Sequence, residues 1–197
     1  MKKVVAIGGS LRKASCNYGL LRAARTLGVD HGIDVDVVEQ DVLRSLPLYD
    51  GDLDPSGSTV GAVPAWPAQV AALRERVRAA DGVLLACPEY NYMPSPILAN
   101  TIAWLSRGND VDQQPFRGKP VAIVGSGGGM GTSRAQYVLR TSLVFLRAHA
   151  MPDEYFGNSF AGAFESHSGN LVGAAETAKL KEHLQAFRAY MDRAGRN

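Results

Sequence analysis

Three short, almost continuous apolar runs constrain the fold of this chain more than any other feature. They are Val4 to Ile7, Val83 to Ala86 and Val121 to Val124, and each leads into small, polar or proline residues. Strands that are buried on both faces have this pattern, which is typical of the central strands of a parallel sheet. The segment 33–37 instead alternates apolar and acidic residues, so it predicts a strand near the edge of the sheet.

Amphipathic segments lie between these runs, and their apolar residues recur at helical spacing. The predicted stripes are Leu20, Leu21, Ala24 and Leu27, with Gly28 ending that helix; Val70, Leu73 and Val77, opposite Arg74, Glu75 and Arg78; Ile97, Leu98, Ile102 and Leu105; and Leu180, Leu184, Phe187 and Met191. Alternating strands and helices predict an α/β fold with helices on both faces of a parallel sheet. No stretch resembles a linker, so we expect one domain, residues 1–197.

The composition argues against several classes of partner. The 46% hydrophobic and 20% charged residues are ordinary for a globular protein. The net charge is only +2 and the Lys and Arg residues are scattered along the chain, which gives little support to nucleic-acid or membrane binding. Cys16 and Cys87 lack metal-ligand spacing and fit a reducing compartment. No apolar run approaches the roughly 18 residues of a membrane span. The apolar run near the amino terminus, Val4 to Ile7, is too short for the core of a signal peptide. We therefore expect a soluble cytoplasmic protein.

The loop after the first apolar run has the residues of a phosphate site. Ser10, Ser15 and Asn17 offer hydrogen bonds and Arg12 offers a permanent charge, at a point where a helix is predicted to begin. Backbone N–H groups and the helix dipole favour an anion there. The same residues also suit a turn followed by a helix N-cap, and the loop matches neither the dinucleotide nor the Walker glycine pattern.

Two further loops follow neighbouring strands of the predicted sheet. Pro88 to Asn91 brings a proline, a carboxylate, an aromatic ring and an amide to a strand end, where open α/β sheets bind ligands. Gly125 to Thr132 is rich enough in glycine for backbone amides to approach a ligand, although a flexible connector has the same composition. The three loops together favour a phosphorylated aromatic cofactor across the strand ends.

Hydrolytic chemistry has little support. The histidines, His31, His149, His167 and His183, fall in or near predicted turns and helix ends, so we expect most of them at the surface. Cys87 precedes a proline at a buried strand end and is interpreted as a small core residue. Glu89 suits a hydrogen-bonding or loop-fixing role, and we assign no catalytic residue and no metal ligand.

Several motifs together resemble one known family. They are Gly9-Ser10-Leu11-Arg12 with Ser15 and Asn17; Leu46-Pro47-Leu48-Tyr49; Ala80-Asp81-Gly82; Pro88-Glu89-Tyr90-Asn91-Tyr92 continuing through Leu98, Asn100 and Ile102 to Trp104-Leu105-Ser106-Arg107; and the glycine run followed by Arg134-Ala135-Gln136-Tyr137 and Leu139-Arg140. This set is similar to the NADPH-dependent FMN reductase family, which includes bacterial quinone and chromate reductases. The resemblance covers most of the chain. It implies a flavodoxin-like three-layer sandwich with a five-stranded parallel sheet in the order 2-1-3-4-5.

The resemblance also implies which residues bind FMN noncovalently. They are Ser10, Leu11, Arg12, Ser15, Asn17, Pro88, Glu89, Tyr90, Asn91, Ser126, Gly127 and Gly128. Within this set, the polar residues of 10–17 would hold the phosphate, residues 88–91 would line the isoalloxazine and ribityl portion, and residues 126–128 would approach the pyrimidine end.

The implied activity is a reductase reaction. Hydride would pass from NADPH or NADH to FMN and then to a small-molecule electron acceptor such as a quinone, a flavin, chromate or an azo compound. The chain departs from the family pattern at Met93, Ser95, Pro96, Ala99 and Ala103, which leaves acceptor preference, nicotinamide preference and subunit contacts open.

A homodimer or homotetramer is also expected. The long segment from Tyr49 to Pro67, the pair Tyr92 and Met93, and the helix through Trp104 are the segments expected to contribute to the contact between subunits.

Three other classes of protein remain open at this point. A flavin-binding electron carrier without nicotinamide turnover fits the loops, although such carriers tend to be acidic. A Rossmann dehydrogenase would use Glu39, after the second strand, as the ribose-binding carboxylate, but the glycine spacing is missing. A protein that kept the fold and lost the cofactor is the third.

Overall fold

The computed structural model describes residues 1–57, 65–108, 114–160 and 162–194. Its strands alternate with helices along most of the chain, as the apolar runs predict. The strands are β1 (Lys2–Gly8), β2 (Ile33–Val37), β3 (Gly82–Ala86), β4 (Glu89–Tyr90), β5 (Met93–Pro94), β6 (Pro120–Gly127), β7 (His149–Ala150) and β8 (Phe156–Asn158).

The main sheet is parallel and runs in the order β2-β1-β3-β6-β7. Val4 of β1 pairs with Val35 of β2 and, on the other side, β1 lies beside β3, which in turn pairs with β6. The strands β4 and β5 form a separate antiparallel hairpin between β3 and α4, so the five strands of this path have the order 2-1-3-4-5 in the chain. The predicted flavodoxin-like topology is confirmed. A further short strand, β8, also pairs with β6, next to its carboxyl end.

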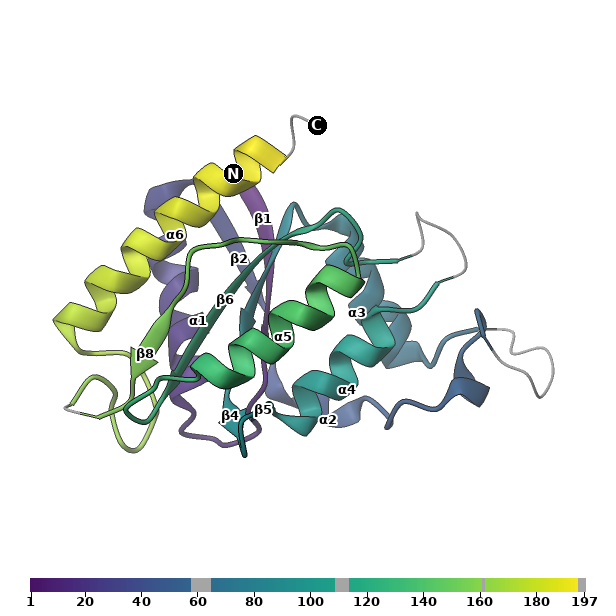
Figure 1. Ribbon diagram of the computed structural model, residues 1–197, viewed down its shortest axis with the longest axis horizontal. Helices are drawn as coiled ribbons and strands as arrows, with labels where there is room; N and C mark the ends of the chain where they lie inside the picture. Colours follow the sequence, from purple (N-terminus) through teal and green to yellow (C-terminus); the bar gives the residue numbers. More distant parts are fainter. Residues whose placement is uncertain (58–64, 109–113, 161, 195–197) are drawn as a thin grey trace.

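Helices cover both faces of the sheet. Figure 1 shows α1 and α6 on one side of the strands and α3, α4 and α5 on the other. None of the described helices is long and apolar enough to cross a membrane. The helices are α1 (Cys16–Leu27), α2 (Gln40–Ser45), α3 (Ala68–Ala79), α4 (Pro96–Leu105), α5 (Ser133–Phe145) and α6 (Ala174–Ala194), with short 3-10 turns η1 (Gly28–His31) and η2 (Gly51–Leu53).

Two polar residues of α3 and α6 that were expected at the surface are buried. Arg74 was expected opposite the apolar stripe of α3, but its guanidinium donates to the carbonyl oxygens of Trp104 (2.9 Å) and Arg107 (2.7 Å) and stacks on Trp66. His183 lies inside α6 rather than at a helix end and is 6% exposed, with its ring against Tyr155. The expectation for Arg74 was wrong, because residue 74 lies four positions after Val70 and three before Val77 and therefore shares their face of the helix. His183 likewise shares the buried face of α6 with Leu180 and Phe187, so its expected place near a helix end was wrong, whereas His149 and His167 are exposed as expected.

The segment after α2 is held against α4 by hydrogen bonds. Asn100 donates from Nδ2 to the carbonyl oxygen of Pro47 (2.9 Å) and accepts from the backbone N–H of Tyr49 (2.7 Å). The indole of Trp104 also donates to Pro47 (2.8 Å), and it is buried, so its side chain is not available for the subunit contact expected of this helix. Residues 58–64 of the long predicted loop lie outside the described part of the chain.

Candidate functional site

The three predicted loops meet at the carboxyl ends of β1, β3 and β6. These strands are adjacent and parallel, with Gly8 beside Ala86 and Ala86 beside Val124, so their following loops emerge at the same edge. Between the loops lies a polar pocket of about 260 Å³. It is lined by Ser10, Arg12, Ser15, Cys16, Asn17, Pro88, Glu89, Tyr90, Ser126, Gly127, Gly128, Gly131, Thr132 and Ser159. All the residues expected to bind the cofactor therefore line this pocket except Leu11 and Asn91.

The first loop carries two serine hydroxyl groups, of Ser10 and Ser15, whose hydrogens are not used in hydrogen bonds with the described residues. Ser15 is the N-cap of α1, and its Oγ accepts from the backbone N–H of Tyr18 at 3.3 Å. The Oγ of Ser10 accepts from the backbone N–H of Arg12 at the same distance. Both hydroxyls act as acceptors here, so each keeps a hydrogen that can be donated to a ligand. The exposed guanidinium of Arg12 makes no hydrogen bond or ion pair with the described residues.

Two residues of α2 fix the outer side of this loop, and the sequence analysis missed both. Gln40 donates from Nε2 to the carbonyl oxygens of Ser10 and Arg12, each at 2.8 Å. Arg44 donates to the carbonyl oxygen of Leu11. Three successive carbonyl groups are therefore satisfied from the α2 side, which fixes the loop before any ligand binds.

Asn17 joins the first loop to the third. Its Nδ2 donates to the carbonyl oxygen of Ser126 at 3.0 Å, and its Oδ1 accepts from the backbone N–H of Ser126 at 3.1 Å. Both bonds are buried and connect α1 to the end of β6. Asn17 therefore connects two walls of the pocket, and its expected contact with a phosphate stays a prediction.

Glu89 fixes the second loop to the amino end of α5. Its Oε2 accepts from the backbone N–H of Ala135 at 3.1 Å, and its Oε1 lies 3.5 Å from Arg134. A carboxylate is favoured at a helix amino end by the helix dipole. The guanidinium of Arg134 also lies 4.3 Å from the ring centre of Tyr92 in the β4–β5 hairpin. These contacts agree with a loop-fixing role for Glu89.

The glycine loop is shaped by close contacts rather than by flexibility alone. A side chain at Gly125 would overlap the Oγ1 of Thr132 and would lie 2.7 Å from the carbonyl oxygen of Cys87. Ser159 follows β8 and donates from both its N–H (2.9 Å) and its Oγ (2.8 Å) to the carbonyl oxygen of Gly127. Thr132, at the end of the predicted glycine segment, and Ser159, which was not predicted, both line the pocket, although neither residue type signals a ligand by itself.

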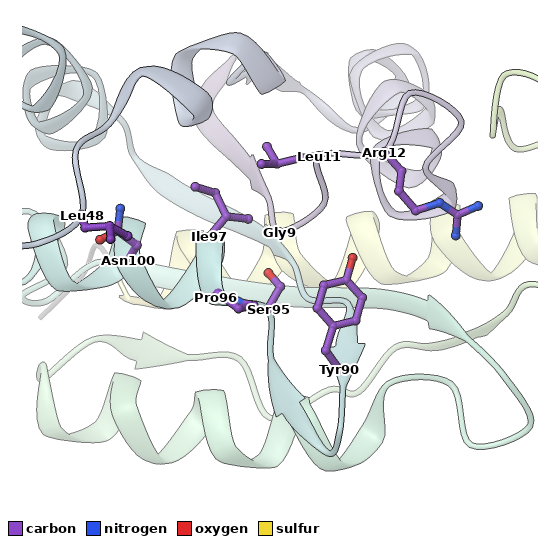
Figure 2. A pocket seen from close by; sticks show the side chains of 9 residues that line it. All are labelled: Gly9, Leu11, Arg12, Leu48, Tyr90, Ser95, Pro96, Ile97 and Asn100. Atoms are coloured by element: carbon purple, nitrogen blue, oxygen red, sulfur yellow. The ribbon is translucent and has the colours of Figure 1, made fainter.

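A second, larger and more apolar cavity of about 540 Å³ adjoins the polar pocket. The two cavities share Arg12 and Tyr90. Figure 2 shows that the guanidinium of Arg12 points away from Leu48 and Ile97, which lie on the other side of the apolar cavity. The residues that line it are Gly9, Leu11, Arg12, Leu48, Tyr90, Ser95, Pro96, Ile97 and Asn100. Leu11, which the family resemblance assigns to the cofactor site, lines this apolar cavity.

Two neighbouring residues stand apart from both cavities. Asn91 is exposed at the turn of the β4–β5 hairpin, where its φ of 53° is in the left-handed region that asparagine tolerates. Cys87 is buried, and burial raises the pKa of its thiol to about 12, so it is an inert core residue as expected.

Comparison with known proteins agrees with this geometry. An NAD(P)H-dependent FMN reductase of Pseudomonas aeruginosa and a quinone reductase of Escherichia coli are each 38% identical over 193 residues, covering 97% of this chain and 96% of the relative. The solved structure of FerB, an NAD(P)H:acceptor oxidoreductase from Paracoccus denitrificans, superposes with a TM-score of 0.80 at 27% identity and covers 98% of both chains. Residues 2–163 match the family described as NADPH-dependent FMN reductase, and the chain belongs to that family.

Proposed function

We propose that this protein binds FMN in the polar pocket and transfers hydride from NADPH or NADH to small-molecule acceptors, with quinones preferred. The observation that carries the proposal is the set of uncommitted donors at the amino end of α1. A free guanidinium, two hydroxyl hydrogens and the first N–H groups of a helix are the groups that bind a phosphate dianion. The buried Oγ of Ser126, which has no partner among the described residues, provides a further polar group for a ligand.

The residues of the pocket bind and orient rather than react. Bound FMN supplies the redox chemistry, so the protein needs to hold the ring and the incoming substrate in register. Arg12 and the hydroxyls of Ser10 and Ser15 would anchor the phosphate, and Tyr90, which lines both cavities, would mark the boundary between cofactor and substrate. Backbone N–H groups of the glycine loop can stabilise negative charge at the neighbouring edge of the ring.

The apolar cavity supports a quinone over an oxyanion as acceptor. Leu48 is 83% exposed, yet its backbone neighbours Pro47 and Tyr49 are hydrogen bonded to Asn100, so a large apolar side chain is held in place at the cavity wall. An uncharged ring gains by leaving water against such a wall, whereas chromate would lose hydration there. Replacing Leu48 by Asp should raise the KM for an alkyl-substituted quinone and leave FMN affinity unchanged. An equal KM for wild type and Leu48→Asp would remove this assignment.

The cofactor assignment is tested first by the visible spectrum of the purified protein and by titration of apoprotein with FMN. Arg12→Ala should weaken FMN binding by about 1.5–3 kcal/mol, the range for a charge-assisted hydrogen bond. Lys13→Ala is the matched control, because Lys13 is the adjacent exposed cation and lines neither cavity. Ser15→Ala is less informative, since it also removes the N-cap of α1. Equal FMN affinity in Arg12→Ala and Lys13→Ala would contradict the phosphate assignment.

The activity is tested by mixing FMN-loaded protein with NADPH or NADH under anaerobic conditions and then with a quinone. Because both substrates would use the same side of the cofactor, we expect ping-pong kinetics. Flavin that stays oxidised with both nicotinamides would favour an electron carrier instead.

Self-association is the remaining part of the proposal, as a homodimer or homotetramer. Tyr92 and Met93 are exposed on the β4–β5 hairpin, and Tyr137, Val144 and Phe145 are exposed on α5, which packs beside that hairpin. Aromatic and methionine side chains are enriched in subunit interfaces. Light scattering should give a multiple of the 21.0 kDa chain, and Phe145→Asp should lower it. A monomeric mass at micromolar concentration would refute this part.

A further inference from the structure

The side-chain amide of Gln136 is the starting point, because all of its hydrogen-bond donors are used inside the protein. Gln136 is 0% exposed in α5. Its Nε2 donates to the carbonyl oxygen of Tyr155 at 2.8 Å and to the Oγ1 of Thr132 at 2.9 Å. The carbonyl of Tyr155 can only accept, so the atom facing it must be the NH2 group, and the orientation of the amide is fixed by chemistry.

This orientation decides what the hydroxyl of Thr132 can do. A primary amide has two N–H hydrogens, and Tyr155 takes one of them, so the other is donated to Thr132. The Oγ1 of Thr132 is therefore an acceptor on the side of Gln136, and its own hydrogen must point elsewhere. No described residue accepts it, and Thr132, which is 1% exposed, lines the polar pocket.

The hydroxyl of Ser126 is also buried and also has a hydrogen that no described residue accepts. Ser126 is 5% exposed and lines the pocket, its backbone N–H and carbonyl are both taken by Asn17, and its Oγ has no partner in the described parts of the chain. Buried polar groups are nearly always paired in native proteins. The Oγ of Ser126 and the unused hydroxyl hydrogen of Thr132 both belong to the glycine loop, residues 125–132, and a ligand that presents carbonyl oxygens could accept a hydrogen bond from each.

We propose that Gln136 is a positioning residue that turns the hydroxyl of Thr132 into a donor toward a carbonyl oxygen of the bound cofactor. The proposal rests on the proposed function, since FMN carries carbonyl groups on its pyrimidine ring. The hydrogen bond from Thr132 stabilises the bound ring directly, and Gln136 acts only through Thr132.

The first test is FMN affinity of apoprotein, measured by titration with flavin fluorescence. Loss of one neutral hydrogen bond in Thr132→Val should weaken binding about threefold to tenfold. Thr132→Ser keeps the hydroxyl and should bind like wild type. The carbonyl resonances of ¹³C-labelled FMN should shift in Thr132→Val and return to the wild-type position in Thr132→Ser, which a change in fold stability alone would not produce.

The second test is a double-mutant cycle between the two positions. Gln136→Met removes the amide at similar volume, and it should weaken FMN binding in the wild-type background but not in Thr132→Val. If Gln136→Met does not fold, Gln136→Glu replaces it. A glutamate carboxyl group carries at most one hydrogen, which the carbonyl oxygen of Tyr155 would take, so its oxygen accepts the hydroxyl hydrogen of Thr132. This variant should therefore shift the FMN carbonyl resonance as Thr132→Val does.

The outcomes separate the two proposals. Wild-type apoprotein that fails to bind FMN overturns the proposed function and this inference together. Wild-type binding with unchanged affinity in Thr132→Val, or an effect of Gln136→Met that is equal in both backgrounds, overturns the inference alone.

Discussion

Removing the side-chain amide of Asn17 should destabilise the apoprotein, because this amide holds the first and third loops of the pocket together. In Asn17→Ala, the backbone N–H and carbonyl of Ser126 lose partners at 3.1 and 3.0 Å in a buried position. An unpaired buried group costs about 1–3 kcal/mol, and partial access of water lowers that cost, so the expected loss is about 2–4 kcal/mol. For a chain of this length, each kcal/mol corresponds to about 2–4 °C, which predicts a melting temperature lower by about 4–16 °C.

The assay is thermal unfolding of apoprotein followed by circular dichroism. Cys16→Ala is the matched control, since Cys16 precedes Asn17 on the same helix and lines the same pocket. Asn17→Asp keeps the acceptor for the Ser126 N–H but faces the Ser126 carbonyl with a carboxylate, so it should be destabilised at neutral pH and recover on acidification, when the protonated acid can donate. Equal melting temperatures for Asn17→Ala and Cys16→Ala would refute the reasoning.

Two further predictions concern Gly125, next to Ser126, and His183 in α6. Gly125→Ala should destabilise the protein by about 1–3 kcal/mol through overpacking against Thr132. Gly128→Ala is the control and should be nearly neutral, because its added carbon would meet nothing closer than 3.7 Å. Equal urea midpoints of unfolding for the two variants would contradict this prediction. Burial lowers the pKa of His183 to about 4, so the unfolded chain gains a proton first as the pH falls. Stability should therefore decrease by about 3 kcal/mol between about pH 6.5 and 4, and His183→Phe should show a flatter pH dependence of stability.

The sequence predicts the sheet and the location of the site because both follow from local pattern. A buried parallel strand needs a run of apolar residues, and a loop that follows such a strand lies at the ligand-binding edge of the sheet by geometry alone. The strand order also follows once the family resemblance supplies the topology. For these reasons all of the residues chosen from three separate loops except Leu11 and Asn91 line one pocket.

What the sequence does not predict is which polar groups pair with each other. Asn17 lies 109 positions from Ser126, and Gln40 lies about 30 positions from the carbonyls that it holds, so no local spacing reveals either contact. Arg74 is polar by type yet buried, because the end of α4 offers it carbonyl oxygens. Gln136 is similar, because the carbonyl oxygen that fixes its amide comes from Tyr155, in the loop before β8 and 19 positions away.

The split outer strand of the sheet has a consequence for solubility. On that side β6 is paired by β7 at one end and by β8 at the other, so the edge is made of two pieces of only two and three residues. At the opposite edge, β2 carries alternating aspartates, and Asp36 is paired with Arg76 at 2.8 Å. Short or charged edges are poor templates for pairing with a strand from another molecule. Both borders of the sheet are thereby protected against the edge-to-edge aggregation to which a long, flat and apolar strand would be exposed.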